Sequence, residues 1–86
     1  MDDEVRVKKH FLIFTKTGKS FSGLTDIWTL QSQSGVDLGQ ISWKAEWRRY
    51  VFFSAKDAYF DEGCLRDIAD FVEALSVAHR KAGLRT

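Results

Sequence analysis

Residues 41–53, ISWKAEWRRYVFF, place aromatic and basic side chains close together in the chain. Aromatic rings stack on nucleic-acid bases, and Lys and Arg side chains hold phosphates. The segment therefore predicts a surface that binds single-stranded nucleic acid. The residues that would form this surface are Trp43, Lys44, Trp47, Arg48, Arg49 and Tyr50.

The same segment has a second interpretation, in which it is a β-hairpin whose rings fill a core or a dimer interface. In a strand that ends near Phe53, Tyr50 and Phe52 point to one side of the sheet, while Arg49 and Val51 point to the other side with Phe53. A helix packs on only one side, so at least one ring of the segment should be exposed or buried between subunits. Both interpretations stay open at this point.

Cysteine catalysis is a third kind of chemistry to consider. Cys64 is the single cysteine and lies near the start of an expected helix, where the helix dipole can lower the pKa of a thiol. A catalytic thiol needs a histidine within hydrogen-bond reach. His79 lies about 22 Å further along the same helix by helical rise, and nothing in the sequence brings His10 close. We therefore expect a buried, unreactive Cys64 and no enzyme.

Metal and cofactor sites are not predicted either. The histidines, the cysteine and the carboxylates lack the close spacing of metal ligands, and Asp61 and Glu62 are explained as helix capping. The segment KTGKSFSG contains Gly-Lys-Ser but lacks the Gly-x-x-x-x-Gly start of a phosphate-binding loop.

Composition is that of a small domain of 86 residues with a formal net charge of +1. Basic residues dominate up to Lys56, and acidic residues dominate from Asp57 onward. The charged start, the single cysteine and the absence of long apolar runs predict a cytoplasmic protein without a signal peptide or membrane span.

Four strands are expected, over residues 10–15, 24–31, 37–43 and 48–54, with turns at KTGK (16–19) and SQSG (32–35). Leu24, Trp28 and Leu30 share one face of the second strand. A change of parity in the third strand predicts a β-bulge beside Gly39. Because every connection is short, the strands should form an antiparallel meander.

A helix is expected over residues 62–81, because apolar residues recur there at spacings of three and four. These residues are Leu65, Ile68, Phe71, Val72 and Leu75. Asp61 is the expected N-cap, with Phe60 stapled onto Leu65, and Gly83 should stop the helix. The predicted fold is therefore α+β: one domain, residues 1–86, with a four-stranded antiparallel meander and one C-terminal amphipathic helix packed on one sheet face.

Residues 38–71, LGQISWKAEWRRYVFFSAKDAYFDEGCLRDIADF, carry a pattern of Leu-Gly-x-Ile-x-Trp, Trp-Arg-x-Tyr-x-Phe, Phe-Asp, Cys-Leu and Asp-Ile-x-x-Phe. This pattern resembles small uncharacterised proteins of phages, prophages and other mobile elements. Members often have a Pro after the Phe pair, where this chain has Ser54 and Ala55. The resemblance implies a mobile-element origin, but no activity and no functional residues.

The order of elements is also similar to single-stranded-DNA-binding dimers of the transcriptional-coactivator type, although element order alone does not fix function. Together these patterns predict a non-enzymatic, homodimeric binding protein that uses an exposed sheet face for single-stranded nucleic acid. The alternative is a protein-interaction module, such as an inhibitor of a host protein, in which the same rings and arginines form the interface.

Overall fold

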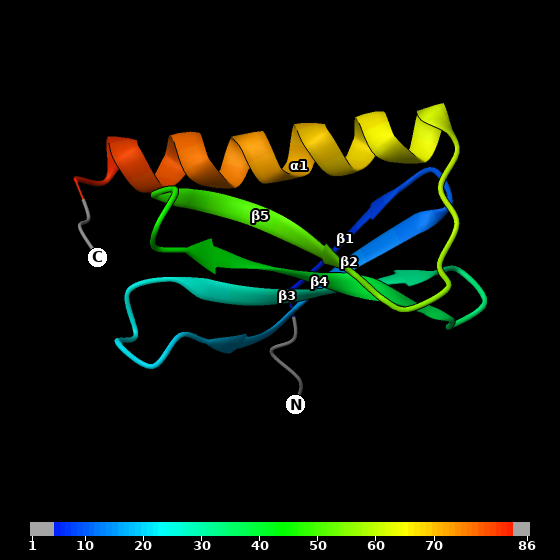
Figure 1. The fold of residues 1–86 in the computed structure, drawn as a ribbon, viewed down its shortest axis with the longest axis horizontal. Coiled ribbons are helices and arrows are strands. Elements are labelled where there is room, and N and C mark those ends of the chain that lie inside the picture. The colour runs from blue at the N-terminus through cyan, green and yellow to red at the C-terminus, as the bar shows by residue number, and fades with distance from the viewer. Residues whose placement is uncertain (1–4, 84–86) are drawn as a thin grey trace.

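A single antiparallel sheet of five strands, each paired with the next along the chain, carries one helix on one side (Figure 1). The computed structural model describes residues 5–83. The elements are β1 (Arg6–Lys9), β2 (Leu12–Lys19), β3 (Asp26–Ser32), β4 (Asp37–Lys44), β5 (Arg49–Ser54) and α1 (Glu62–Lys81). The α+β class, the antiparallel meander and the C-terminal helix are confirmed. The prediction of four strands was wrong, because there are five.

The additional strand is β1, which lies just before the expected first strand. Its sequence, RVKK, has one apolar residue, Val7, which packs against the core, whereas its other three side chains are charged. Residues 12–15 of the predicted strand 10–15 belong to β2, whereas residues 10–11 form the turn between β1 and β2, where His10 adopts a positive φ of 54°. A short, charged edge strand has little hydrophobic signal, which explains why the sequence pattern missed it.

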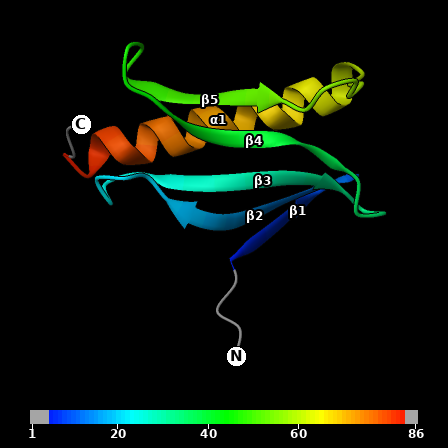
Figure 2. The same ribbon diagram turned by 60° about the horizontal axis from the view of Figure 1, so that its bottom comes forward.

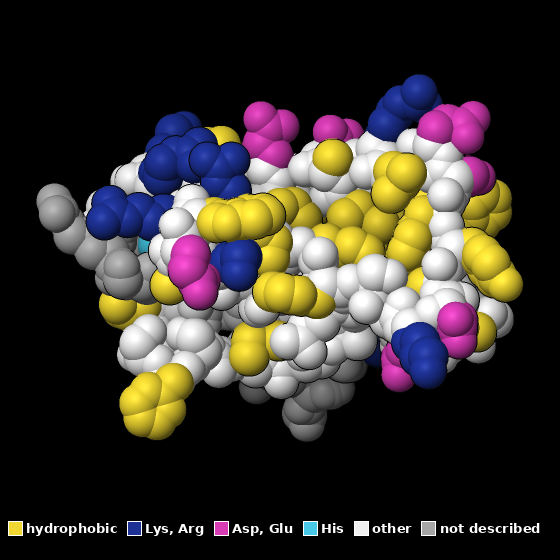
Figure 3. All heavy atoms as spheres, in the orientation of Figure 1, with side chains coloured by type: hydrophobic (Ala, Val, Ile, Leu, Met, Phe, Trp, Pro, Cys, Tyr) yellow, Lys and Arg dark blue, Asp and Glu magenta, His cyan; other side chains and the backbone are white. Residues whose placement is uncertain are grey.

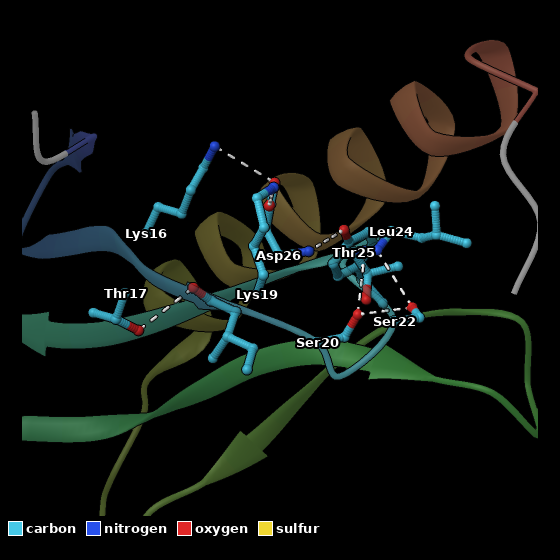
Figure 4. Close-up of polar contacts among 10 residues, drawn as sticks. Lys16, Thr17, Lys19, Ser20, Ser22, Leu24, Thr25 and Asp26 are labelled. Carbon is cyan, nitrogen blue, oxygen red and sulfur yellow. Dashed lines mark hydrogen bonds and ion pairs between the residues drawn. The ribbon is translucent and has the colours of Figure 1, made fainter.

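The predicted turn at residues 16–19 was also wrong, because β2 continues to Lys19. The pairing of β2 with β3 shifts register between Lys16 and Gly18. Gly18 therefore belongs to a β-bulge and not to a reversal of the chain. The chain reverses at residues 20–25, where the Ser20 N–H donates to the carbonyl of Thr25 at 2.8 Å. Figure 4 shows the hydroxyls of Ser20 and Ser22 accepting further backbone N–H groups of this loop. The Nζ of Lys19 pairs with the carboxylate of Asp26 at 2.9 Å.

The bulge predicted beside Gly39 is confirmed. Leu30 pairs with Gly39 and Gln31 pairs with Asp37, so Leu38 is the extra residue. A Cβ on Gly39 would lie 2.4 Å from the carbonyl oxygen of Phe53 and 2.6 Å from the Phe52 ring. Only glycine fits this close approach of β4 to β5 without displacing the backbone.

The helix has its predicted bounds, and the side chain of Asp61 caps it by accepting a 2.8 Å hydrogen bond from the Cys64 N–H. Ile68, Phe71, Val72 and Leu75 pack on the core as predicted. Leu65, which was expected among them, is 52% exposed instead. The ring of Phe60, predicted to staple onto Leu65, lies edge-to-face against Phe52.

The core lies between α1 and one face of the sheet. The helix crosses the strands diagonally: Phe71 stacks on Phe14 of β2 at 4.1 Å, whereas His79 lies 4.3 Å from the ring of Trp43 in β4. Trp28 and Leu30 are buried there, but Leu24, predicted on the same face, is exposed in the β2–β3 loop. Among residues 5–83 no element covers the other side, which we call the open face (Figure 2).

Candidate nucleic-acid interface

The six residues predicted to bind nucleic acid divide between the two sides of the sheet. Trp43 and Tyr50 face α1, because they pair with each other across β4 and β5 and contact His79 of the helix. Tyr50 is only 5% exposed, and its hydroxyl accepts a 3.1 Å hydrogen bond from the Asp26 N–H. Burial raises the pKa of Tyr50. With α1 in place neither ring presents a face to a base, so the stacking role predicted for Trp43 and Tyr50 does not fit this structure.

The other four residues lie together at the β4–β5 turn. Lys44 and Arg49 form the last rung of the hairpin, on the open face. Trp47 is 59% exposed at the tip, and the Nζ of Lys44 lies 5.4 Å from the centre of its ring. The Nε of Arg49 donates to the backbone carbonyl of Trp47 at 3.3 Å, which holds this guanidinium against the turn. The β4–β5 turn thus places one exposed ring, that of Trp47, near three cationic side chains, Lys44, Arg48 and Arg49.

Arg48 lies within this turn and has a positive φ. Its φ is 55°, a left-handed conformation that costs a non-glycine residue roughly 1–2 kcal/mol. Its N–H bonds back to the Lys44 carbonyl at 2.9 Å, and its side chain is exposed.

Glu46 is the only carboxylate among residues 44–49. Its Oε1 lies 3.6 Å from the Nζ of Lys44. A backbone hydrogen bond and the charge of Lys44 lower the pKa of Glu46. The carboxylate is therefore ionised at neutral pH and offsets one of three positive charges, which leaves the turn positive.

Further residues at the same end of the molecule were missed by sequence reasoning. In an antiparallel meander every second connection lies at the same end of the strands. The β2–β3 loop, with Phe21 fully exposed at its tip, therefore lies at the same end of the molecule as the β4–β5 turn. The contact of His79 with Trp43 brings the end of α1 there too. Lys and Arg side chains gather at this end in Figure 3. We call it the basic end, formed by Phe21, Lys44, Trp47, Arg48, Arg49, Arg80 and Lys81.

The open face adds polar and aromatic groups next to the basic end. One rung across all five strands runs through Arg6, Thr15, Thr29, Gln40 and Phe53. The ring of Phe53 is 48% exposed, and the exposed amide of Gln40 and the half-buried hydroxyl of Thr29 lie beside it on this rung, whereas Thr15 is buried. Such a face offers hydrogen bonds to sugars and phosphates and a second ring for stacking.

The opposite end of the molecule contains a hollow of about 340 Å³, lined by His10, Phe11, Asp61, Gly63, Cys64, Arg66 and Asp67. The Nδ1 of His10 lies 2.7 Å from an Asp67 carboxylate oxygen. The fold thus brings His10 and Cys64 to one hollow, although no spacing in the sequence predicted that they would meet. However, burial and a side-chain hydrogen bond with Asp61 raise the pKa of Cys64, which favours the protonated thiol over the nucleophilic thiolate.

Within the described part of the chain, α1 is the one helix, and it is not apolar enough to cross a membrane. Comparison of the chain with protein-family models, curated proteins and solved structures gave no match. The resemblance to phage and mobile-element proteins therefore stays a prediction, and the candidate interface rests on its own geometry.

Proposed function

We propose that this protein binds single-stranded nucleic acid through its basic end and the adjoining open face. The observation that supports this function best is the β4–β5 turn, where the exposed indole of Trp47 lies among Lys44, Arg48 and Arg49. A single strand suits such a surface, because its unpaired bases can stack on a ring while cations hold the adjacent phosphates.

The proposed role of each group follows from its exposure. Trp47 stacks on a base, and Phe21 and Phe53 are the further exposed rings along the path of the strand. The three cations of the turn hold phosphates, and Arg80 and Lys81 extend the positive surface over the end of α1. Because stacking and phosphate contacts do not read base edges, binding should depend little on sequence.

Intrinsic fluorescence tests this proposal, because only one of the three tryptophans is exposed: Trp28 is buried and Trp43 is half-buried. An unlabelled oligothymidine should quench the emission of the wild type with saturation, and the affinity should fall steeply as salt is raised. Trp47→Phe keeps the fold and a ring but should lose most of the signal change. A flat titration at low salt would refute nucleic-acid binding.

The alternative is that the basic end contacts a protein, for example a host protein that this chain inhibits. Exposed Trp and Arg side chains are the residue types that dominate protein–protein hot spots, which favours this alternative in the case of a flat titration. A stable complex in a pull-down that is lost with Trp47→Ala would then support it.

A non-enzymatic role, a mobile-element origin and a cytoplasmic location belong to the same proposal. They are supported by the protonated state favoured for Cys64, by the motif pattern of residues 38–71 and by the lone cysteine.

A further inference from the structure

The two edges of the sheet differ in how they are protected against pairing with another strand. Proteins commonly protect an edge by making its strand short and charged. The β1 edge follows this rule, since three of its four residues are Lys or Arg. The β5 edge does not, because Val51, Phe52 and Phe53 form an uninterrupted apolar run.

The backbone of β5 leaves specific groups free along this edge. The Ala55 N–H donates to Leu38 of β4 at 2.9 Å, so the odd-numbered residues of β5 direct their N–H groups toward β4. The even-numbered residues point outward, as the Tyr50 N–H shows by donating to the hydroxyl of Ser76. Phe52 and Ser54 thus direct their N–H and C=O groups to the outside, where no described strand pairs with them (Figure 2).

A band of apolar surface between β5 and α1, which we call the groove, runs beside these groups. Ser76 marks the side of the helix that faces the edge, and residues spaced by three and four from it, namely Val72, Ala69 and Leu65, lie on the same side. The exposure of Leu65 follows from this position, because no described side chain fills the groove there. Figure 3 shows hydrophobic side chains forming a band between α1 and β5.

The charges at the two ends of this groove are opposite. Because α1 runs antiparallel to β5 (Figure 1), Arg49 and Arg80 lie at one end. Asp57 and the first turn of the helix, with Asp61 and Glu62, lie at the other end, where Lys56 offsets one of these three negative charges. A two-fold axis through the middle of the groove places the basic end of one groove against the acidic end of another. The surface is therefore complementary to itself.

We propose that the β5 edge pairs with the β5 edge of a second copy of this chain, antiparallel and about a two-fold axis at Phe53. In this register Phe52 lies opposite Ser54 of the second copy, and the four outward N–H groups of these residues all find carbonyl partners. The Tyr50 N–H keeps its bond to Ser76. The result is a ten-stranded sheet with both helices on one side and one continuous open face.

This inference does not rest on nucleic-acid binding, since it uses the strand edge and is tested without any oligonucleotide. The register predicts Cβ atoms of the two Phe53 residues about 4.5–5.5 Å apart, within reach of a disulfide after small adjustment. Phe53→Cys in a Cys64→Ser background should therefore form a disulfide dimer rapidly under mild oxidation. Val51→Cys in the same background is the control, because this register separates its two copies by roughly 13 Å along the strands.

Sedimentation at several concentrations supplies the second measurement. Ser54→Pro removes an outward N–H that β4 does not use, and so two of the four inter-subunit hydrogen bonds, whereas Ser54→Ala keeps that N–H. The dimer dissociation constant should rise about tenfold or more for Ser54→Pro and stay near the wild-type value for Ser54→Ala. A wild type that is monomeric at all concentrations, or equal cross-linking of the Val51 and Phe53 variants, would overturn the proposal.

Discussion

The hydroxyl of Ser76 accepts a 3.0 Å hydrogen bond from the backbone N–H of Tyr50, and both residues are buried. This bond joins the helix to the outward side of the edge strand β5. It satisfies a backbone donor that has no strand partner, and it restricts the free edge to the second half of β5. One side chain of α1 thus determines how much of the edge is open to another molecule.

Replacing Ser76 by Ala should lower the free energy of unfolding by about 1–3 kcal/mol, because the Tyr50 N–H would be buried without a partner. Ser54→Ala is the matched control, since the Ser54 hydroxyl is exposed and bonds only to the adjacent Ala55 carbonyl. Its effect should be within about 0.5 kcal/mol. Urea unfolding followed by circular dichroism measures both, and equal effects of the two substitutions would contradict this account of the edge.

Two glycine substitutions should have opposite effects. Gly39→Ala places a Cβ against the Phe53 carbonyl and the Phe52 ring and should cost about 1–3 kcal/mol. A Cβ at Gly63, in the first turn of α1, meets nothing closer than 3.6 Å, so Gly63→Ala should stabilise the helix by up to about 1 kcal/mol. Thermal unfolding of both variants would show the contrast, and a neutral Gly39→Ala would mean that β4 and β5 are not as close as described.

Stability should depend on pH through Asp61. Hydrogen bonds from the backbone and side chain of Cys64 lower the pKa of this carboxyl in the folded protein. A lowered folded pKa means that the stabilisation is present above the pKa of the unfolded chain and is lost as pH falls through the folded value. The difference in unfolding midpoint between wild type and Asp61→Ala should therefore shrink between pH 7 and about pH 3.

Asp61→Asn is the control for this effect, because an amide oxygen caps a helix without titrating. Its difference from Asp61→Ala should stay constant over the same pH range. If that difference shrank as much as the wild-type difference does, the carboxylate of Asp61 would not be the titrating group.

Arg48→Gly should separate stability from binding. Glycine adopts a φ near 55° without strain, so the free energy of unfolding of the variant should equal that of the wild type or exceed it by up to about 1 kcal/mol. It also lacks one of the three cations of the turn, so oligonucleotide affinity should fall and its salt dependence should weaken by about one phosphate contact. Unchanged affinity in this well-folded variant would remove Arg48 from the interface.

The elements that the sequence predicted correctly are those whose pattern repeats. The apolar spacing of α1 and the capping residue Asp61 gave the helix its bounds, and the change of parity around Gly39 predicted a bulge. Most of the predicted strand 10–15 lies in β2, but β1 was missed because its three charged residues hide the alternation of its side chains. The turn predicted at 16–19 was wrong because Gly18 belongs to a β-bulge and not to a chain reversal.

The candidate interface was less predictable than the fold. The alternation of side chains along a strand correctly predicted that Tyr50 and Phe52 share one side of β5. Which side the helix covers depends on long-range packing, such as the contact of Trp43 with His79. Leu65 likewise fits the apolar pattern of a buried residue yet is exposed, whereas its neighbour Cys64 packs against the core. Phe21, in a polar loop, had no pattern that marked it.

The most direct test of the central claim is a map of backbone amide chemical shifts during titration with oligothymidine at low salt. Binding through the basic end predicts that the shifts concentrate at residues 44–49, at the β2–β3 loop around Phe21 and at the end of α1, with smaller changes along the open face near Phe53. The hollow around His10 and Cys64 should be unaffected. Shifts confined to that hollow, or no shifts at saturating oligonucleotide, would contradict the account.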